Sequence, residues 1–425
     1  MTQLNGRRRV GLALTAALAA SVALAGCSSS GGGGGKTEIT FSYLWSGNEA
    51  KALEGVIADY NASQDKVVVK GVSSPDATKQ LASMSSTSGS FDISDNFDSN
   101  VGSWAAKGVL APLDDYEIDT DAFVPVTLES AKYDGKLYAV PIAVHSLELM
   151  YNKKLLAAAG VKPPTTMDEL ADAVRKTTKK DASGKVTQLG LGYAGSDATT
   201  LLETLGYAFG GTWDKDGKPS PDEPGNVAGL EWYQKNVIDA VGAKALTNFY
   251  AGVGQYMSAQ DPFYTGKFAM VVDGEWQSAA VANTAPNLDW GVTAIPTATA
   301  GKENSTLVTS SILFIPANSK HKDAAADFLK YLVSKEPMET FSLALGNLPA
   351  RTDLMDSDAY AGLPGIKTWM SGLTSPNAQT RVSAPYSSQY SDDMQVAFEA
   401  FSRGQTDAQG TLDGLAKKTA SYDGQ

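Results

Sequence analysis

Hydrophobic and polar positions in the first part of the chain follow two periods in turn. Residues 37–45 alternate apolar and polar side chains, which is the two-residue period of a strand. Residues 49–60 repeat apolar side chains every three or four positions, as an amphipathic helix does. A short apolar run at 66–70 and a helical pattern at 76–84 repeat this order. The strand–helix–strand–helix order predicts a parallel sheet with helices on its faces.

Polar segments that follow two of these strands are the first candidates for a binding site. A strand is predicted to end at residues 91–93, and a polar run, 94–100, leads from it into the next helix. In sheets of this kind, ligands lie beyond the carboxyl ends of the strands. We therefore expect site residues at 45–48 and at 94–99.

The two periods return further along the chain. The further strands are predicted at 189–193, 268–272 and 290–295, and the further helices at 153–159, 166–177, 201–209, 227–237, 323–334, 392–401 and 411–420. Thr166 and Glu169 have the spacing of a capping box at the start of one of these helices. Asp216 and Gly217 have the composition of a hairpin turn.

One extended segment, residues 134–156, does not fit a single sheet. It is apolar, is interrupted by Pro141, and passes a lone histidine, His145, before a helix begins. Because proline cannot donate a hydrogen bond to a strand ladder, it lies at sheet edges or crossovers. We interpret 134–156 as the place where the chain leaves one lobe for a second, and 306–316 as a second crossing. Two lobes joined in this way would enclose a cleft that opens and closes.

Residues 1–26 have the pattern of a signal peptide. Three arginines precede an apolar stretch that is shorter than a membrane span. The stretch ends in Leu-Ala-Gly followed by Cys27, which resembles the lipobox of bacterial lipoproteins. We expect Cys27 to carry the lipid (palmitate), with an unmodified thiol as the alternative, and 27–36 to form a flexible Gly/Ser tether. This leader predicts a protein anchored to the extracytoplasmic face of the cell membrane.

Composition fits a large globular protein. The 425 residues are 43% hydrophobic and 19% charged, which suits two domains or one large bilobal domain. The formal net charge of −12 argues against nucleic acid or an anionic membrane surface as a partner, although solubility alone explains it more simply. Cys27 is the only cysteine, which excludes disulfide bonds within the chain and zinc sites of the usual type.

Residues with catalytic potential are few. There are two histidines, His145 and His321, and His321 lies between two lysines in a solvated cluster. The sequence has no HExxH, GxSxG or GxGxxG motif and no phosphate-binding P-loop. We therefore expect a protein that is not an enzyme and needs no cofactor or metal. A secreted hydrolase that uses two carboxylates stays open as an alternative, because any two of the 47 acidic residues could converge in a cleft.

Aromatic and small polar residues carry the remaining chemistry. Those at predicted strand ends and turns are Trp45, Ser46, Asn48, Asn96, Phe97, Asp98, Trp276 and Tyr390. Sugars need this mixture, because their hydroxyls bond to carboxylates and amides while their C–H faces lie on aromatic rings. A single aromatic residue is more often part of the core. Trp276 differs because it follows a strand–helix turn, where chains are usually exposed. For His145, a ligand-binding role and a buried structural role are both open.

Several longer segments resemble one protein family. They are YAVPIAVHSLELMYNKKLL at the first crossing, GKFAMVVDGEW followed by WGVTAIP, NLPAR, and the C-terminal SRGQT. Together with the lipobox, they are similar to the family 1 extracellular solute-binding proteins, the maltose-binding-protein-like receptors of carbohydrate ABC importers. The resemblance implies an α/β, two-lobed, periplasmic-binding-protein-like (type II) fold with hinge strands between the lobes. It implies lobe 1 at 37–142 and 270–308, lobe 2 at 147–266 and 316–425, and the hinge at 143–146 and 309–315.

The resemblance also implies roles for individual residues. Stacking on sugar rings is expected of Trp45, Phe97, Trp276 and Tyr390, and hydrogen bonding to hydroxyls is expected of Asn48, Asn96, Asp98, His145, Asp273 and Glu275. Arg351 is a further expected contact, with a surface salt bridge as its alternative. His145 stands where maltose-binding protein has an acidic residue, which puts maltose itself in doubt. Ser99 likewise replaces an aspartate, with Asp98 adjacent as a substitute.

These patterns predict a monomeric, extracytoplasmic substrate-binding lipoprotein of an ABC importer. It would bind a carbohydrate, an oligosaccharide, between its lobes and deliver it to the permease by hinge closure, with no nucleic-acid partner. The alternatives are a secreted carbohydrate-active hydrolase and a binding protein for a non-sugar solute. A polyamine site would concentrate acidic residues in the cleft, and an anion site would need Arg or Lys at the strand ends. Neither pattern is evident among the predicted site residues.

Overall fold

Two large mixed sheets, one of seven strands and one of five, organise the computed structural model, which describes residues 35–195 and 198–422. Lys36–Gln425 form one compact unit. The predicted signal peptide, the lipidation of Cys27 and nearly all of the Gly/Ser tether lie outside the described residues. Along the chain, the strands of both sheets are interspersed with helices, which confirms the predicted α/β class.

The first sheet begins with the parallel strands that the N-terminal pattern predicts. β1 (Thr37–Tyr43) pairs in parallel with its neighbours on both sides. The order across the sheet is β15 (Leu348–Pro349), β6 (Ala139–Ser146), β14 (Leu307–Phe314), β3 (Ile93–Phe97), β1 and β2 (Val67–Ser73), with β16 (Gln379–Thr380) beside β14. The apolar positions of β1, Ile39, Phe41 and Tyr43, are all buried, as their alternation predicts.

The third strand departs from the prediction, because β3 begins where a strand was expected to end. It contains Ser94, Asp95 and Asn96, and all three side chains are buried. Gln80 Nε2 donates to Ser94 Oγ at 2.6 Å, and Leu44 N donates to Asp95 Oδ1 at 2.8 Å. Such partners allow polar side chains to be buried in a strand. A hydrophobic pattern does not reveal them, because they come from other elements.

The second sheet corrects the lobe boundaries that the resemblance implied. Its order is β13 (Trp290–Thr293), β7 (Glu148–Asn152), β12 (Phe268–Asp273), β9 (Val186–Tyr193) and β8 (Lys179–Lys180). Because β12 and β13 both pair with β7, most of segment 270–308, expected in lobe 1, belongs with the second sheet. The helices at 322–345, expected in lobe 2, pack instead against β1 and the helix that follows it. The ladder hydrogen bonds, and not the order of segments along the chain, decide this grouping.

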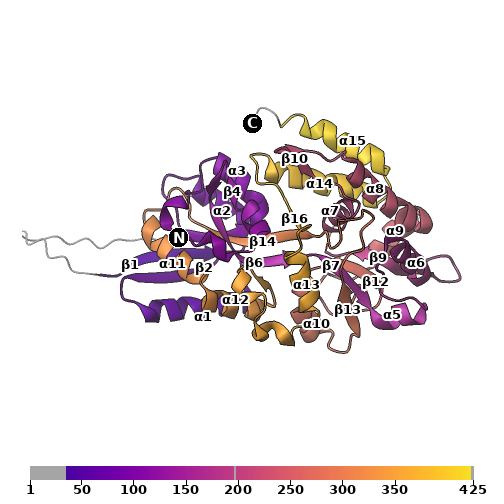
Figure 1. The fold of residues 1–425 in the computed structure, drawn as a ribbon, viewed down its shortest axis with the longest axis horizontal. Coiled ribbons are helices and arrows are strands. Elements are labelled where there is room, and N and C mark those ends of the chain that lie inside the picture. Colours follow the sequence, from indigo (N-terminus) through magenta and orange to yellow (C-terminus); the bar gives the residue numbers. More distant parts are fainter. Residues whose placement is uncertain (1–34, 196–197, 423–425) are drawn as a thin grey trace, which may run out of the picture. The chain divides into compact units, whose positions relative to one another are not determined.

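Helices surround both sheets (Figure 1). The part of the chain built on the seven-stranded sheet is called the first half here, and the part built on the five-stranded sheet is called the second half. The helices of the first half are α1 (Gly47–Ser63), α2 (Ala77–Met84), α3 (Val101–Ala106), α4 (Pro125–Glu129), α11 (Lys322–Leu332) and α12 (Lys335–Leu345). The helices of the second half are α5 (Lys153–Ala158), α6 (Met167–Thr177), α7 (Thr199–Ala208), α8 (Pro224–Tyr233), α9 (Ala243–Tyr250) and α10 (Gln277–Thr284). α13 (Ile366–Leu373) contacts β6 and β7, whereas α14 (Ser387–Ser402) packs on α7 and α15 (Ala408–Thr419) packs on α8.

Local signals in the sequence are confirmed at two positions. Thr166 Oγ1 accepts a hydrogen bond from the Glu169 N–H at 3.2 Å and caps α6. β10 (Asp214–Lys215) and β11 (Lys218–Pro219) form a hairpin that turns through Gly217, whose φ of 72° is readily adopted by glycine. The remaining short elements named here are η1 (Asp98–Asn100), the paired strands β4 (Lys132–Tyr133) and β5 (Lys136–Leu137), and the π-helical turn η4 (Gln234–Asp239).

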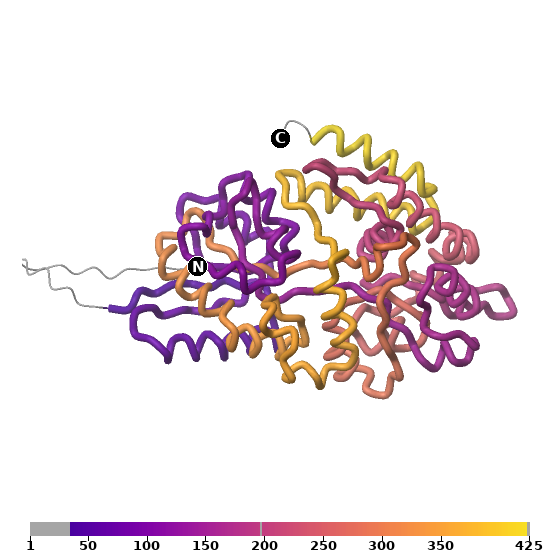
Figure 2. Tube along the Cα trace, viewed as in Figure 1, coloured from indigo at the N-terminus to yellow at the C-terminus, as the bar shows by residue number. Residues whose placement is uncertain are grey.

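The chain passes between the two sheets at β6–β7, at β14 and near β16 (Figure 2). β6 is followed by β7 with only Leu147 between them, and Leu147 N donates to the Leu307 carbonyl at 3.1 Å. The first two crossings therefore lie side by side. The passage through β16 was not predicted, and it joins the others because Gln379 N donates to the Thr306 carbonyl at 2.9 Å.

The segments expected to form the hinge belong to the first sheet. Residues 143–146 pair with β14 and β15, and most of 309–315 lies in β14, between β6 and β3. The strand ladder continues through both segments, with one register shift between Ser311 and Ile312 in the pairing of β14 with β6. The change from one sheet to the other occurs at Leu147 and just before Leu307.

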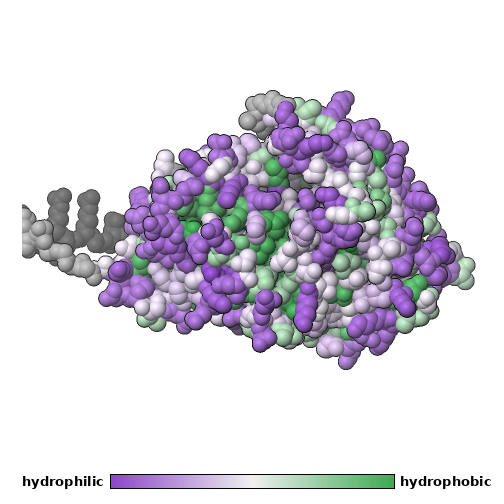
Figure 3. Space-filling model, in the orientation of Figure 1, coloured by the Kyte–Doolittle hydropathy of each residue, from purple (hydrophilic) through white to green (hydrophobic). Residues whose placement is uncertain are grey.

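The surface drawn in Figure 3 is mostly hydrophilic, with apolar side chains gathered left of the centre of the view. Among the described residues, the large hydrophobic side chains that are exposed are Val72, Phe97, Met257 and Val396. Of these, Phe97 lies at a strand end where ligand contacts were predicted. Within 35–195 and 198–422, no helix combines the length and the apolar character that crossing a membrane requires.

Candidate functional site

Residues of both sheets meet where β6 ends and where β12 turns into α10. His145 lies on β6, and its Nδ1 is 2.7 Å from Oε1 of Glu275, which follows β12. The His145 ring also contacts the Trp276 indole edge to face, with centroids 5.1 Å apart. Glu275 is fully buried, whereas Trp276 is partly exposed. Glu275 Oε2 has no hydrogen-bond partner among the described residues, which leaves one acceptor of this carboxylate unused.

A second group of side chains lies behind Trp276. The indole N–H donates to Tyr256 Oη at 2.7 Å, and the Tyr256 hydroxyl donates to Asp273 Oδ1 at 2.9 Å. Asp273 also accepts from Gly274 N and from Gln277 Nε2. Burial raises the pKa of Asp273 to about 7, although these bonds favour its charged form. Asp273, expected to bind a sugar hydroxyl, is thus surrounded by donors of the protein itself.

Asp98 interacts both with His145 and with Arg381, the residue around which a cavity is built. It lies on η1 and is buried, and its Oδ2 accepts from Ser310 N at 2.9 Å and from Ser130 Oγ at 3.1 Å. Its Oδ1 has no hydrogen-bond partner among the described residues. Burial raises the pKa of Asp98, and the charges of Arg381 and His145 act in the opposite direction. Asp98 therefore lies within electrostatic reach of both Arg381 and His145.

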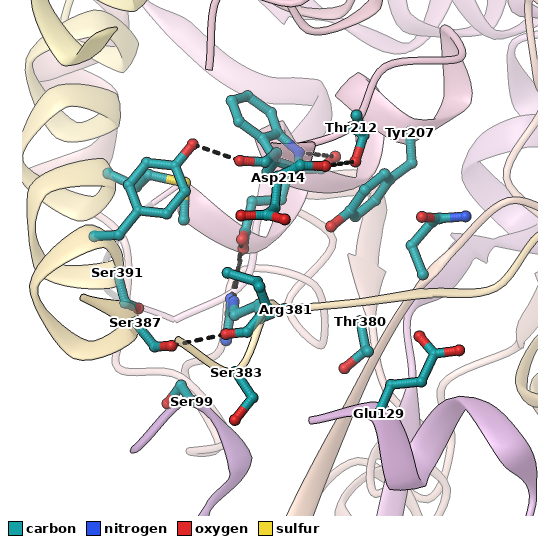
Figure 4. Close-up of a pocket in the computed structure, with 16 residues that line it drawn as sticks. Ser99, Glu129, Tyr207, Thr212, Asp214, Thr380, Arg381, Ser383, Ser387 and Ser391 are labelled. Atoms are coloured by element: carbon teal, nitrogen blue, oxygen red, sulfur yellow. Dashed lines mark hydrogen bonds and ion pairs between the residues drawn. The ribbon is translucent and has the colours of Figure 1, made fainter. Parts of the chain in front are cut away.

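A cavity of about 300 Å³ surrounds Arg381 (Figure 4). Its lining comes from η1 and α4 of the first half, from α7, α14 and residues 212–214 of the second half, and from 379–383 of the crossing segment. Arg381 is near the middle of the close-up, with Ser99 and Ser383 below it. The cavity therefore lies between the two halves of the compact unit.

An ion pair between the fully buried Glu203 and the partly exposed Arg381 forms the polar centre of this cavity. Arg381 Nε and Nη2 donate to the two carboxylate oxygens of Glu203 at 3.0 and 2.5 Å. Burial by itself would lower the pKa of Arg381. The adjacent Glu203 carboxylate more than offsets this effect, so the pKa lies above its usual value and the guanidinium stays charged. Thr380 Oγ1 and Ser383 Oγ also line the cavity and have no hydrogen-bond partner among the described residues. The cavity thus combines a fixed cation with hydroxyls that can donate or accept.

The segment that follows β1 supplies Glu49, an acidic neighbour of His145. Trp45, expected to stack on a sugar, is 9% exposed and packs on Phe341, with ring centroids 4.9 Å apart. Asn48 is exposed in the first turn of α1. Next to it, partial desolvation raises the pKa of Glu49, and the nearby His145 opposes this shift. The start of α1 therefore lies within electrostatic reach of the end of β6.

Asn96 and Phe97, neighbours on β3, lie in different surroundings. Asn96 is buried, and its Nδ2 donates to Gln80 Oε1 at 2.5 Å while its Oδ1 accepts from Asn100 Nδ2 at 2.7 Å. The Phe97 side chain is 59% exposed. Asn96 therefore supports the turn into η1, and Phe97 presents its ring outside the core.

Arg351 and Tyr390 already bond to other groups of the protein, which limits how each could contact a ligand. Arg351 Nε and Nη2 donate to the carboxylate of Asp353 at 2.9 and 3.0 Å, which is the surface salt bridge given as its alternative. Tyr390 lines the cavity, but it is 3% exposed and its hydroxyl donates to the Trp213 carbonyl at 2.9 Å. Tyr390 therefore offers the cavity its ring and not its hydroxyl.

Several residues of these groups were not among those predicted from the sequence. Glu203 is the one charged residue in the apolar helix Thr199–Ala208, and that position alone indicates a buried charge in need of a partner. Arg381 follows β16, a strand that was not predicted, so this basic residue was not among the strand ends considered from the sequence. Tyr256 lies in an irregular loop and had no signal. Among the described residues, no three His, Cys, Asp or Glu side chains are grouped as a metal ion would require.

Known solute-binding proteins are similar to this chain in sequence. The family model described as "Bacterial extracellular solute-binding protein" matches residues 31–339. The galactooligosaccharide-binding protein of Bacillus subtilis (strain 168) is 25% identical over 355 residues, 80% of this chain and 80% of that protein. The maltotriose-binding protein of Pyrococcus abyssi is 26% identical over 274 residues, 63% of this chain and 56% of that protein. A binding protein of Brucella abortus is 30% identical over 265 residues, and the chain spans 61% of its length.

Solved structures share the fold. CpMnBP1 with mannotriose bound superposes with a TM-score of 0.76 at 26% identity, over 90% of this chain and 100% of that chain. The cyclic α-maltosyl-1,6-maltose binding protein from Arthrobacter globiformis superposes with a TM-score of 0.74 at 24% identity, over 91% and 99% of the two chains. The two-lobed α/β fold predicted from the sequence is thereby confirmed. Because the family model covers well over half of the residues, the chain belongs to the bacterial extracellular solute-binding protein family.

Proposed function

We propose that this protein is the extracytoplasmic substrate-binding lipoprotein of a carbohydrate ABC importer. The observation that carries the proposal is the meeting of His145 with Glu275 and Trp276, because it joins residues of both sheets in one place. The Trp276 indole is partly exposed, and Glu275 has an unused acceptor oxygen. A saccharide needs this combination, since its C–H face packs on an aromatic ring while its hydroxyls donate to carboxylates.

The length of the polar surface favours an oligosaccharide as the ligand. Asp98 interacts electrostatically both with His145 and with Arg381, so it links the indole to the cavity around Arg381. A chain of two or more sugar units would contact Trp276 at one end and the hydroxyls of Thr380 and Ser383 at the other. The names of the relatives support the same class of ligand, because they include a maltotriose-binding and a galactooligosaccharide-binding protein.

Closure of the two halves over the ligand is the second part of the proposal. The crossings at Leu147, Leu307 and Gln379 are hydrogen-bonded close together, which suits them to act as a hinge. A ligand that contacts both halves favours the closed form by its differential affinity for that form. We infer that a permease recognises the closed form and that a lipid on Cys27 holds the protein at the membrane. No chemical step is part of this function.

A ligand screen tests the proposal. The purified protein would be titrated with mannotriose, maltotriose and galactooligosaccharides while tryptophan fluorescence and thermal stability are followed, and the mixture would be assayed for released reducing sugar. A saturable response to one sugar without product is expected. Release of product would instead establish a hydrolase. A response only to amino acids, peptides or polyamines would overturn the carbohydrate assignment.

Replacement of Trp276 tests the stacking contact directly. Trp276→Ala should weaken sugar binding by about 1–3 kcal/mol, judged from the loss when an aromatic partner of a stacked base is removed. Trp232→Ala is a matched control, because Trp232 is also partly exposed but lies on α8, outside the group formed by His145, Glu275 and Trp276. Binding by the Trp276 variant that equals binding by the parent would assign Trp276 to the core.

A further inference from the structure

The hydrogen bonds behind Trp276 have directions that chemistry fixes completely. An indole N–H only donates, so Tyr256 Oη must accept from Trp276, at 2.7 Å. Gln277 Nε2 also donates to Tyr256 Oη, at 3.1 Å. The single hydroxyl hydrogen of Tyr256 must then go to Asp273, whose two oxygens lie at 2.9 and 3.1 Å. Tyr256 therefore connects the indole to a buried carboxylate.

The amide of Gln277 is fixed on both of its sides. One atom of the amide faces the Asp273 carboxylate, an acceptor, and is therefore the Nε2 donor, while Tyr264 Oη donates to Oε1 at 2.6 Å. That Nε2 donates to Asp273 Oδ2 at 2.7 Å as well as to Tyr256. Tyr256 is thus held by two side chains, Asp273 and Gln277, that are themselves anchored to β12 and α10.

The loop that carries Tyr256 is itself constrained. Met257, the next residue, has a φ of 56°, in the left-handed region that non-glycine residues seldom adopt. The Asp261 carboxylate accepts from Met257 N at 2.8 Å and from Phe263 N at 2.8 Å, and so holds this conformation. Backbone of this kind persists where surrounding contacts determine it, and it is common at ligand-binding sites.

We propose that Tyr256, held by Asp273 and Gln277, is a positioning residue that fixes the plane of the Trp276 indole for its ligand. The indole is held from two directions, since His145 packs against the ring at 85° and Tyr256 holds its N–H. A ring fixed before binding loses less conformational freedom when a sugar stacks on it. The inference rests on the proposed function, and it gives Asp273 a supporting role in place of the sugar contact expected from sequence.

The first test needs no ligand. Tyr256→Phe keeps the ring and removes only the hydroxyl that accepts from Trp276. The near-ultraviolet circular dichroism of the purified protein, minus that of its Trp276→Phe counterpart, gives the signal of Trp276 alone. This signal should lose most of its intensity in the Tyr256→Phe background. Tyr360→Phe is the control, because it removes a buried hydroxyl, bonded to Ser342, outside this network. An unchanged Trp276 signal in the Tyr256 variant would overturn the proposal.

The second test is a double-mutant cycle on affinity, with mannotriose and maltotriose as probes. Tyr256→Phe should weaken binding about three- to tenfold, the range expected when one side chain must be immobilised on binding. In the Trp276→Phe background it should have no further effect, because that ring has no N–H to position. Equal effects in both backgrounds, or none in the parent, would show that Tyr256 does not act through Trp276. If the parent binds neither sugar and no other saccharide, the proposed function fails, and the dichroism alone decides the positioning role.

Discussion

Removal of the Arg381 charge should destabilise the protein far more than removal of its partner. Arg381 donates two hydrogen bonds to Glu203, and Glu203 is fully buried in α7. Arg381→Met, which keeps an unbranched apolar stem but removes the guanidinium, leaves Glu203 without its cation. Glu203→Leu leaves Arg381 with a side chain that is 22% exposed and with Asp98 still nearby. The guanidinium can therefore recover part of its hydration, whereas the carboxylate cannot.

The magnitudes follow from the distances. Two unit charges about 3 Å apart attract by roughly 5–6 kcal/mol at an effective dielectric constant of about 20. Desolvation of the two ions costs several kcal/mol each and offsets most of this attraction. The net contribution of the intact pair is therefore small, but breaking it from one side costs about 3–5 kcal/mol, because the remaining charge is buried and unpaired. We expect a loss near this range for Arg381→Met and a smaller loss for Glu203→Leu. The double variant should be more stable than Arg381→Met alone.

Urea unfolding at pH 7, followed by tryptophan fluorescence, measures these differences, provided that the slopes agree between variants. Arg403→Met is the matched control, because Arg403 pairs with Glu399 on the surface of α14 and both side chains are largely exposed. Such a pair contributes about 0.3–0.5 kcal/mol. A loss below about 1 kcal/mol for Arg381→Met would contradict the reasoning, since that value belongs to exposed pairs. A double variant as unstable as the single one would contradict it as well.

Two further predictions concern buried groups elsewhere in the fold. Burial raises the pKa of Asp95 from 3.8 to about 7, so its stabilising contribution is complete below pH 4 and is lost as the pH rises through 7. Asp95→Asn keeps an acceptor for Leu44 N. The parent should lose stability between pH 4 and 8, and the variant should lack up to about 4 kcal/mol of this loss, as measured by unfolding at each pH. An equal loss of stability in parent and variant would refute this prediction. A Cβ on Gly372 would lie 2.1 Å from Glu148 Oε1 near the crossings, so Gly372→Ala should cost about 1–3 kcal/mol. Gly414→Ala on α15, where a Cβ meets no atom within 4 Å, should be neutral or slightly stabilising, and equal stability of the two variants would disprove the clash.

Elements that depend on local chemistry could be predicted from the sequence. The alternation of apolar residues gave β1, the capping box gave the start of α6, and Gly217 marked the turn of a hairpin. Each of these signals acts over a few residues. β3 shows the limit, because Asp95 and Asn96 are buried in a strand only through partners supplied by other elements.

The assignment of segments to lobes depends on strand pairing, which is not local. β12 lies between β7 and β9, although about 75 residues separate β9 from β12 in the sequence. Nothing in the apolar run 268–272 indicates which sheet it joins, because a buried strand is apolar on both faces. β16 is two residues long, so it has no period at all, yet it positions Arg381.

The site could be predicted where one short motif contains it and not where distant segments meet. Glu275 and Trp276 are adjacent in sequence, and the turn after a strand pointed to them. Arg381 and Glu203 are 178 positions apart, and only the fold brings them together. Tyr256 could not be found by pattern, because its role comes from hydrogen bonds to Asp273 and Trp276 across the chain.

Polar atoms that lack a protein partner support the proposed position of the ligand. Among the described residues these atoms include Glu275 Oε2, Asp98 Oδ1, Thr380 Oγ1 and Ser383 Oγ. Leaving a buried polar group unpaired costs about 1–3 kcal/mol, so each of these atoms needs a partner from outside the protein. In each carboxylate the other oxygen is held by the protein, which fixes the group and leaves one acceptor free. Water fills such positions when no ligand is bound, and a sugar hydroxyl that reproduces the same hydrogen bond can displace it. The pattern therefore favours a ligand with many hydroxyls over an apolar or singly charged one.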